Sequence, residues 1–166
     1  MQNMYLEIKT PDVAGESTSS QGTGLIEVLS FSHGVSMPLT FGASNTSRAH
    51  GRCQHQDFTI SKYVDIASPT LNALCCGGDD IATIILHIFK ADSTSTTPIE
   101  YLTYTLTSCI VTSCAVGGSG GDAPTETVTF NYGKIVWAYI KQGPAAGGAN
   151  KGTMSTNWDL SLNKKA

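Results

Sequence analysis

Apolar and polar residues alternate along most of this chain with a period of two. The stretch from Thr125 to Ile140 shows this clearly, with threonine and asparagine alternating with valine, phenylalanine and tyrosine. A period of two places successive side chains on opposite faces of a β-strand, and β-branched and aromatic residues favour strands. Glycine, proline, serine and aspartate separate these segments, which is typical of an all-β sandwich or barrel. The predicted strands are MYLEIKT from Met4, LIEVLSFSHGVSM from Leu25, QDFTISKYV from Gln56, ATIILHIFKA from Ala82, IEYLTYTLTSCIVTSCAV from Ile99, TETVTFNYGKIVWAYI from Thr125 and TNWDLSLN from Thr156.

One segment, SPTLNALCCGG, predicts a helix instead. Ser68 is the expected N-cap, Pro69 suits the first helical position, and Gly77 is the expected stop. A helix of about two turns does not persist alone, so packing against the sheet must hold it. The residues expected to face the sheet are Leu71, Leu74 and Cys75.

Two polar, glycine-containing segments interrupt the strand pattern. Leu39–Gly51, LTFGASNTSRAHG, is too long for a tight hairpin and is predicted to project as a loop. Gly143–Gly152, GPAAGGANKG, is predicted to be a flexible connector before the final strand. Without repeats, heptads or a domain linker, the 166 residues fit one domain spanning 1–166.

The charge and composition narrow the classes of partner. Charged residues make up 14% of the chain and the net charge is −3, with no basic cluster, so nucleic-acid binding is not expected. No apolar run approaches the ~20 residues of a membrane span, so membrane insertion is not expected either. Serine and threonine give a polar, weakly charged surface that suits contact with other proteins. The start, MQNMYLEIKTPD, lacks the features of a signal peptide, so synthesis in the cytoplasm is expected.

The cysteines give little support to a disulfide framework or a zinc site. Their number, five, is odd, and their spacings match the usual zinc knuckles poorly. The interpretation we favour is that they are small buried hydrophobic residues. They are Cys53, Cys75, Cys76, Cys109 and Cys114.

A glycine-rich stretch, GGSGGD from Gly117, raises the question of phosphate binding. Phosphate-binding loops lead from a strand into a helix, whose N-terminal N–H groups hold the anion. Here the stretch leads into a strand pattern, and both GxGxxG and the GK[ST] of a P-loop are missing. The glycines are therefore predicted to allow a turn between two strands.

No established catalytic motif is present. The histidines form neither HxH nor HExxH, and no serine lies in a GxSxG elbow. His55 and Asp57 are expected to share one strand face, where they fit either a base and its orienting carboxylate or an exposed polar face. Asp79 and Asp80 are expected to be solvated loop charges. We therefore predict no catalytic residue, no cofactor and no metal.

Several segments together resemble one family. They are GLIEVLSFSHGVS, QDFTISKYVDIASPTLNALCC, IEYLTYTLTSCIVTS, GGSGGDAPTETVTFNYGKIVWAY and NWDLSLNKK, in this order from about residue 4 to residue 165. They resemble the Hcp (haemolysin-coregulated protein) family of bacterial type VI secretion. The match departs from the family pattern at Asn157, where glycine is expected, and leaves no room after Trp158 for a fused toxin domain.

The resemblance implies a mainly β fold, a β-barrel of two antiparallel sheets with one short flanking α-helix. It also implies hexameric rings that stack into the inner tube of a contractile, phage-tail-like machine. The implied partners are other copies of the chain, the sheath and spike proteins, and effector proteins that the rings carry or chaperone. The protein would be cytoplasmic first and then secreted through the type VI machine without a signal peptide.

The resemblance also suggests which residues matter. The segment Leu39–Gly51 resembles in position an extended loop that reaches a neighbouring subunit or ring. If Leu29 and Phe31 face the core, Ser30 and Ser32 line the channel; a solvated outer face is the other interpretation. The candidate inter-subunit residues in the loop are Phe41, Asn45, Ser47, Arg48 and His50.

Two alternatives remain open at this point. One is a tail-tube protein of a phage or phage-derived particle. The other is a small β-barrel hydrolase or zinc enzyme that uses His55, Asp57 and nearby cysteines.

Overall fold

A computed structural model describes residues 2–41, 48–91, 97–142 and 150–165. Among these residues, no helix is long and apolar enough to cross a membrane. The elements in chain order are β1 (Gln2–Lys9), β2 (Ile26–Glu27), β3 (Ser30–Ser32), β4 (Val35–Ser36), β5 (Leu39–Phe41), β6 (Arg48–His50), β7 (Gln54–His55), β8 (Phe58–Tyr63), α1 (Ser68–Gly77), β9 (Asp80–Lys90), β10 (Ile99–Gly117), β11 (Thr125–Gln142) and β12 (Asn150–Asp159).

The fold is mainly β, as predicted. An 8-stranded antiparallel sheet, in the order β2-β1-β9-β10-β11-β8-β3 with β12 also paired to β11, curls into a half-barrel. Two small two-stranded sheets, β4–β7 and β5–β6, and the single helix α1 accompany it. The long strands β10 and β11 extend from one end of the half-barrel to the other. β11 pairs with β8 along its first part and with β12 along its second part.

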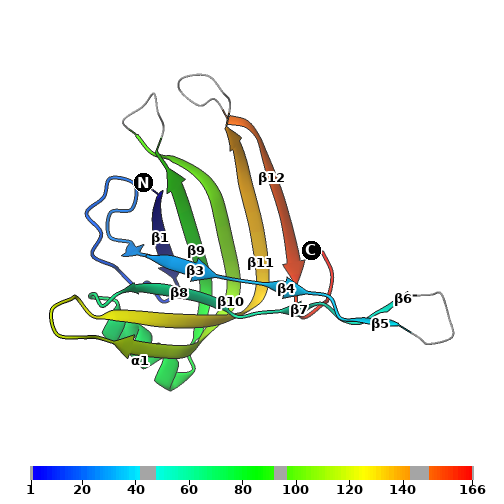
Figure 1. The fold of residues 1–166 in the computed structure, drawn as a ribbon, viewed down its shortest axis with the longest axis horizontal. Helices are drawn as coiled ribbons and strands as arrows, with labels where there is room; N and C mark the ends of the chain where they lie inside the picture. The colour runs from blue at the N-terminus through cyan, green and yellow to red at the C-terminus, as the bar shows by residue number, and fades with distance from the viewer. Residues whose placement is uncertain (1, 42–47, 92–96, 143–149, 166) are drawn as a thin grey trace.

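The two long strands change direction where Ser108 faces Gly133. Ser108 has a positive φ of 54°, and the regular pairing passes from Thr107–Lys134 to Cys109–Tyr132 around it. A Cβ at Gly133 would lie 3.3 Å from the Ser108 Cβ, a tight contact, so the close approach of the strands favours glycine there. This pair marks the bend that lets one sheet wrap around the core (Figure 1).

The segment Leu25–Met37 is not the single strand that its pattern predicts. It is divided into β2, β3 and β4 because each takes a different partner strand: β1, β8 and β7. The Val28 N–H donates to Met4 O (3.0 Å), and the next N–H, of Leu29, donates to Ser61 O (2.8 Å). Since β2 and β3 are the opposite edges of the large sheet, the chain between them closes the barrel.

The core fills the concave side of the curled sheet, with α1 against β10. Leu71 and Leu74 of α1 are buried and Cys75 packs against the same core, as the helical spacing predicts. The fully buried large apolar side chains include Leu6, Ile26, Phe58, Ile60, Leu71, Ile81, Ile84, Leu86, Ile88, Leu106 and Phe130.

The helix ends differ from the prediction by one residue each. Ala67, not Ser68, is the N-cap, because the Asp65 carboxylate accepts the Ala67 N–H (2.9 Å) and the Ser68 hydroxyl donates to Glu126 instead. At the other end Gly78, with a φ of 66°, takes the left-handed position predicted for Gly77.

The connections follow the sequence in part. Gly118–Pro124 joins β10 to β11 as a turn between strands, and Gly121 has a φ of 119°, so this prediction is confirmed. The final strand is earlier than predicted: β12 ends at Asp159, whose carboxylate accepts the Leu162 N–H (3.0 Å) in the following turn. Asn157 lies inside β12, paired with Val136. Most of the predicted connector Gly143–Gly152 lies outside the described residues.

Candidate functional site

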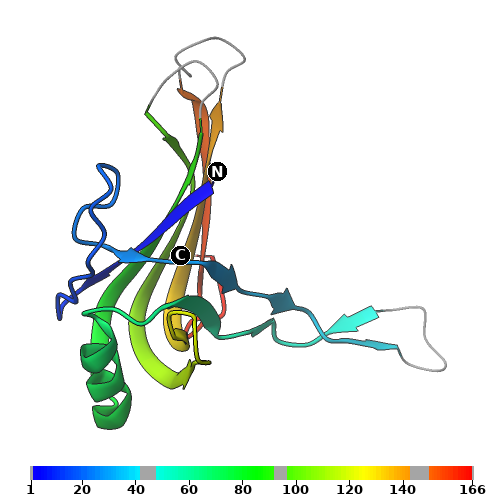
Figure 2. The same cartoon turned by 60° about the vertical axis from the view of Figure 1, so that its left-hand side comes forward.

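An arm of two successive β-ribbons leaves the sheet, and the predicted projecting loop Leu39–Gly51 contains its outer ribbon. The inner ribbon pairs β4 with β7 and the outer ribbon pairs β5 with β6. The Gly51 N–H donates to Pro38 O (3.0 Å) between them, and the Gln56 N–H donates to Gly34 O (2.9 Å) at the base. Figure 2 shows the arm standing away from the half-barrel.

Three of the candidate inter-subunit residues, Phe41, Arg48 and His50, lie on the outer ribbon of this arm. Phe41 pairs with Arg48 and Leu39 pairs with His50 in the backbone register of the outer ribbon. Asn45 and Ser47 lie outside the described residues. The assignment of all five residues to a subunit contact remains a prediction.

Two histidines join the base of the arm to the large sheet. His33 Nε2 lies 2.6 Å and His55 Nδ1 3.2 Å from the hydroxyl oxygen of Tyr132 on β11. The same hydroxyl lies 3.2 Å from Gln56 O, so one oxygen of β11 contacts two imidazoles and a backbone carbonyl of the arm's base. His33 precedes β4 and His55 belongs to β7, so one hydroxyl group holds both strands of the inner ribbon. We call these three side chains the arm anchor.

Burial keeps the arm anchor uncharged. Burial lowers the pKa of His33, and the nearby His55 lowers it further; burial also lowers the pKa of His55. Burial raises the pKa of Tyr132. Aromatic side chains surround the site: the His55 ring stacks on Trp158 with a centroid separation of 6.4 Å and an interplanar angle of 22°.

A further contact ties the arm to the end of the chain. The Arg52 guanidinium, between β6 and β7, donates to the backbone oxygen of Leu160 in the turn after β12. The Leu160 N–H in turn donates to Gly133 O (2.9 Å) at the bend of β11. The arm is therefore held both by Tyr132 of the large sheet and by the turn that follows β12.

Exposed apolar side chains follow the inner half of the arm. Val35, Met37 and Leu39 are 47%, 47% and 49% exposed at alternate positions of the chain. Alternate positions in extended backbone face the same way. We call these three residues the arm stripe; an exposed apolar row of this kind is typical of a protein–protein contact.

The channel candidates Ser30 and Ser32 are both exposed on β3. Between them Phe31 points inward, stacked on Phe58 at 5.9 Å and against Tyr104 at 5.3 Å. Leu29 does not face the core, because the chain crosses between sheet edges there and leaves the side chain 42% exposed. The two serines thus share an outer surface, and its place in a channel remains a prediction.

The proposed base–carboxylate pair is not assembled. His55 contacts Tyr132, whereas Asp57 accepts from Asn131 Nδ2 (2.8 Å) and from Thr112 Oγ1 (3.2 Å). Asp79 and Asp80, at the start of β9, are exposed as predicted. In the described ranges, no three histidine, cysteine or acidic side chains are grouped to hold a metal ion.

The cysteines do not behave alike. Cys109 is fully buried, in agreement with the prediction, but Cys76 is exposed on α1, so the prediction of a small buried hydrophobe is wrong there. Burial raises the pKa of Cys109 to about 12.

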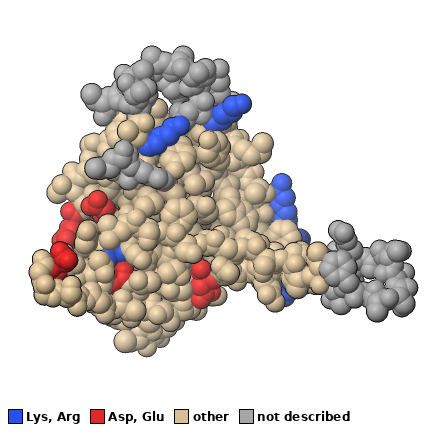
Figure 3. All heavy atoms as spheres, in the orientation of Figure 1, with Lys and Arg blue, Asp and Glu red and all other residues tan. Residues whose placement is uncertain are grey.

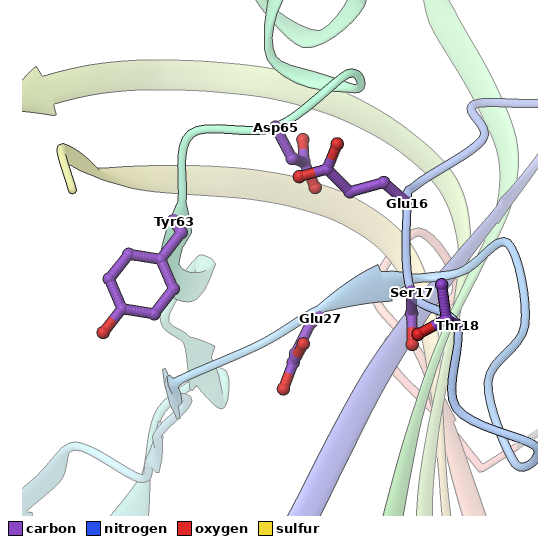
Figure 4. A pocket seen from close by; sticks show the side chains of 6 residues that line it. All are labelled: Glu16, Ser17, Thr18, Glu27, Tyr63 and Asp65. Carbon is purple, nitrogen blue, oxygen red and sulfur yellow. The ribbon is translucent and has the colours of Figure 1, made fainter.

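A cavity of about 310 Å³ lies near α1. Three carboxylates surround it (Figure 4), and on the face shown in Figure 3 acidic side chains gather at the lower left while basic ones lie above and to the right. Asp65 forms an ion pair with Lys62, whose Nζ lies 2.6 Å from Asp65 Oδ1. No nucleophile–base pair accompanies these carboxylates among the lining residues, which are Glu16, Ser17, Thr18, Glu27, Tyr63 and Asp65.

A buried ion pair fixes the start of α1 to the sheet. Lys62 Nζ lies 2.7 Å from Glu126 Oε1, and both side chains are fully inaccessible to solvent. The Ser68 hydroxyl donates to the same Glu126 oxygen (2.7 Å). Glu126 Oε2 is buried with no hydrogen-bond partner in the part of the chain that the structure describes.

The sequence contains a pattern that predicts this ion pair, although the strand predictions did not use it. Lys62 continues the buried positions of Phe58 and Ile60, and Glu126 precedes Val128 on the buried face of β11. Opposite charges at buried strand positions predict a cross-strand partner, and the register indeed pairs Glu126 with Lys62. The arm anchor had no such signal, because its partners are 99 and 77 residues apart.

The described residues form a curled antiparallel β-sheet with one short helix and an anchored two-ribbon arm. The model of the family described as "Type VI secretion system effector, Hcp" matches residues 5–139. The chain therefore belongs to the Hcp family of type VI secretion system tube proteins, which are structural and non-enzymatic. The hydrolase and zinc-enzyme alternatives are accordingly wrong.

Individual relatives agree with this assignment. Protein hcp1 of Pseudomonas aeruginosa is 34% identical over 160 residues, covering 96% of each chain. The crystal structure of Hcp1 from Salmonella typhimurium matches with a TM-score of 0.80 and 29% identity over 99% of both chains. A type VI secretion system effector from Yersinia pestis matches with a TM-score of 0.74 and 27% identity over 94% of this chain and 98% of its own.

Proposed function

We propose that this chain is a subunit of hexameric rings that stack into the inner tube of a type VI secretion machine. The family membership supports a role in the type VI secretion machine, and the anchored arm supports association with other subunits. A ring requires a contact between two different surfaces of the subunit that closes by rotation, and stacking requires a second, axial contact. An arm that leaves the half-barrel is suited to reach a neighbouring subunit or ring.

The observation that carries the proposal is the arm stripe on a fixed arm. Val35, Met37 and Leu39 place apolar surface in solvent at positions that contribute nothing to the core of the single chain. Two imidazoles and a guanidinium hold the arm in place, so its ordering is largely complete before association, which reduces the entropic cost of binding.

The rings are proposed to carry effector proteins and to leave the cytoplasm with them through the machine. Exposed serines such as Ser30 and Ser32 suit a channel wall that accepts varied cargo, because hydroxyl groups hydrogen-bond without a fixed charge. The partners are then other copies of this chain, the sheath and spike proteins and the effectors.

Electron microscopy of the purified protein tests the proposal. Closed rings with six-fold symmetry are expected in the absence of any other component. Particles the size of one chain at tens of micromolar protein would contradict it.

A further inference from the structure

A pair of cysteines connects α1 to β10. Cys114 Sγ on β10 lies 3.7 Å from the backbone oxygen of Leu71 in α1. Cys75 is one helical turn further along the same helix, and it lies near enough to Cys114 to help raise the pKa of the Cys114 thiol. Both side chains are half-buried and pack against the core, so this contact joins two elements that the fold already holds together.

We propose that Cys75 and Cys114 are a redox modification site: they form a reversible disulfide that fixes α1 to β10 when the protein meets a low-molecular-weight disulfide such as glutathione disulfide. In the cytoplasm the pair stays as thiols, because glutathione and thioredoxin systems keep thiols reduced there. That oxidation takes place outside the cytoplasm rests on the proposed function. The formation of the disulfide itself does not depend on it.

The reaction proceeds by two thiol–disulfide exchanges. The Cys75 thiolate attacks one sulfur of glutathione disulfide, the S–S bond breaks, and one glutathione leaves as its thiolate. Cys114 then loses its proton, its sulfur attacks the Cys75 sulfur, and the second glutathione leaves. Two protein thiols are oxidised, one glutathione disulfide is reduced to two glutathione thiols, and the two thiol protons end on them.

The environment of Cys114 makes its thiol the one that reacts in the second exchange. Burial, with smaller contributions from Cys75, Glu126 and Cys76, raises the pKa of Cys114 to about 11. The thiol is therefore protonated at neutral pH and is a slow nucleophile until Cys75 is activated beside it. Closure of the disulfide should accelerate as the pH rises.

Other pairings fit the geometry less well. Cys75 and Cys76 are neighbours in a helix, and side chains at adjacent helical positions do not face each other. Cys109 lies on β10 as well but is fully buried, so an oxidant cannot reach it in the folded protein. These observations favour Cys75 with Cys114, and the variants below distinguish this pair from Cys76 with Cys114.

Incubating the folded wild-type protein with glutathione disulfide, followed by trypsin without reduction, tests the inference. Trypsin cuts after Lys62, Lys90 and Lys134, so the disulfide joins peptide 63–90 to peptide 91–134. Mass spectrometry should find this joined species with two hydrogen atoms fewer than the separate peptides. Thiol titration of the denatured protein should fall by two of the five thiols.

Four single variants assign the pair. Cys76→Ala and Cys109→Ala should keep the joined peptides, whereas Cys75→Ala and Cys114→Ala should lose them. The oxidised wild-type protein should also unfold at a higher temperature than the reduced protein, because the crosslink restricts the unfolded chain. Absence of the joined species in the wild type, or its persistence in Cys75→Ala, would overturn the inference. Neither result depends on whether the rings form, so failure here is distinguishable from failure of the proposed function.

Discussion

The Tyr132 hydroxyl oxygen lies 2.6 Å from Nε2 of His33, a residue 99 positions earlier in the chain. This contact, repeated by His55 at 3.2 Å, makes one side chain of β11 the support for both strands at the base of the arm. The geometry of the arm is therefore set by the sheet and not by the arm alone.

Tyr132→Phe should loosen the arm without dismantling the fold. It removes the oxygen that two imidazoles share and keeps the aromatic ring in place, so a loss of about 1–2 kcal/mol in the free energy of unfolding is expected. Hydrogen exchange of the backbone from 35 to 41 and from 48 to 55 should become faster. Tyr139→Phe, at a position that is 47% exposed, is the matched control. Equal exchange rates in both variants would show that the anchor does not hold the arm.

Breaking the buried pair should be far more costly than breaking a surface pair. Lys62→Met leaves the buried Glu126 and the nearly buried Asp65 without their shared cation, so a loss of about 3–5 kcal/mol in the free energy of unfolding is expected. The control is Lys9→Met, which removes a Lys9–Glu7 pair whose side chains are 50% and 29% exposed, and should cost about 0–1 kcal/mol. Urea denaturation measures both changes. The double variant Lys62→Met with Glu126→Leu should recover much of the loss, and no recovery would contradict the explanation by an unpaired buried charge.

His87 should contribute stability over a limited pH range. Its Nδ1 lies 2.5 Å from Glu100 Oε1, and this hydrogen bond raises the pKa of His87 above the ordinary 6.5, with a smaller contribution from Glu7. The same bond lowers the pKa of Glu100. The contribution of His87 is complete below its unfolded pKa of 6.5 and is lost as the pH rises through the raised value. The contribution of Glu100 to stability is present above its ordinary pKa and is lost as the pH falls through its lowered pKa.

Comparison with His87→Gln isolates this effect. The difference in free energy of unfolding between wild type and variant should be largest in mildly acidic solution and should shrink towards alkaline pH. The lowered pKa values of His33 and His55 act in the opposite direction, destabilising the protein in acid, but they are common to both proteins and cancel in the difference. A difference that grows with rising pH would contradict the assignment.

A bulky side chain on β3 tests the channel. Ser30→Trp points outward from the subunit, so the fold and the rings should persist. If the serine face lines the channel, co-purification of an effector with the rings should fall by tenfold or more, a loss of about 1.4 kcal/mol or greater in binding free energy. Thr18→Trp, which lines the separate cavity, is the comparison. Undiminished effector capture by intact Ser30→Trp rings would place this face on the outside of the ring.

Local periodicity predicted most strands because it depends only on neighbouring residues. The strands at Thr125 and Ile99 were placed within two residues of their observed ends, and the helix within one. The strand pattern predicted an all-β sandwich or barrel, and the length and polarity of Leu39–Gly51 predicted a projecting loop. The resemblance narrowed the first to a barrel and gave the loop its expected contact with a neighbouring subunit or ring. The buried pair of Lys62 and Glu126 was predictable in principle from polar residues at buried positions.

Contacts between distant segments set the features that local patterns missed. The change of partner between Val28 and Leu29 divides a continuous strand pattern, although nothing in the alternation marks it. Arg52 contacts Leu160, 108 residues further along the chain, and the bend at Ser108 favours a glycine on the opposite strand. Such contacts depend on how the sheet curls, which single-segment patterns do not encode.

The mass of the purified protein in solution tests the central claim most directly. Light scattering on the wild type should give a particle six times the 17.5 kDa of one chain. Val35→Asp combined with Met37→Asp places charge on the arm stripe and should shift the mass towards one chain while the circular dichroism stays unchanged. Ile66→Asp, at an exposed apolar position away from the arm, should keep the hexamer. A wild type with the mass of one chain, or arm variants that remain hexameric, would contradict association through the arm into rings.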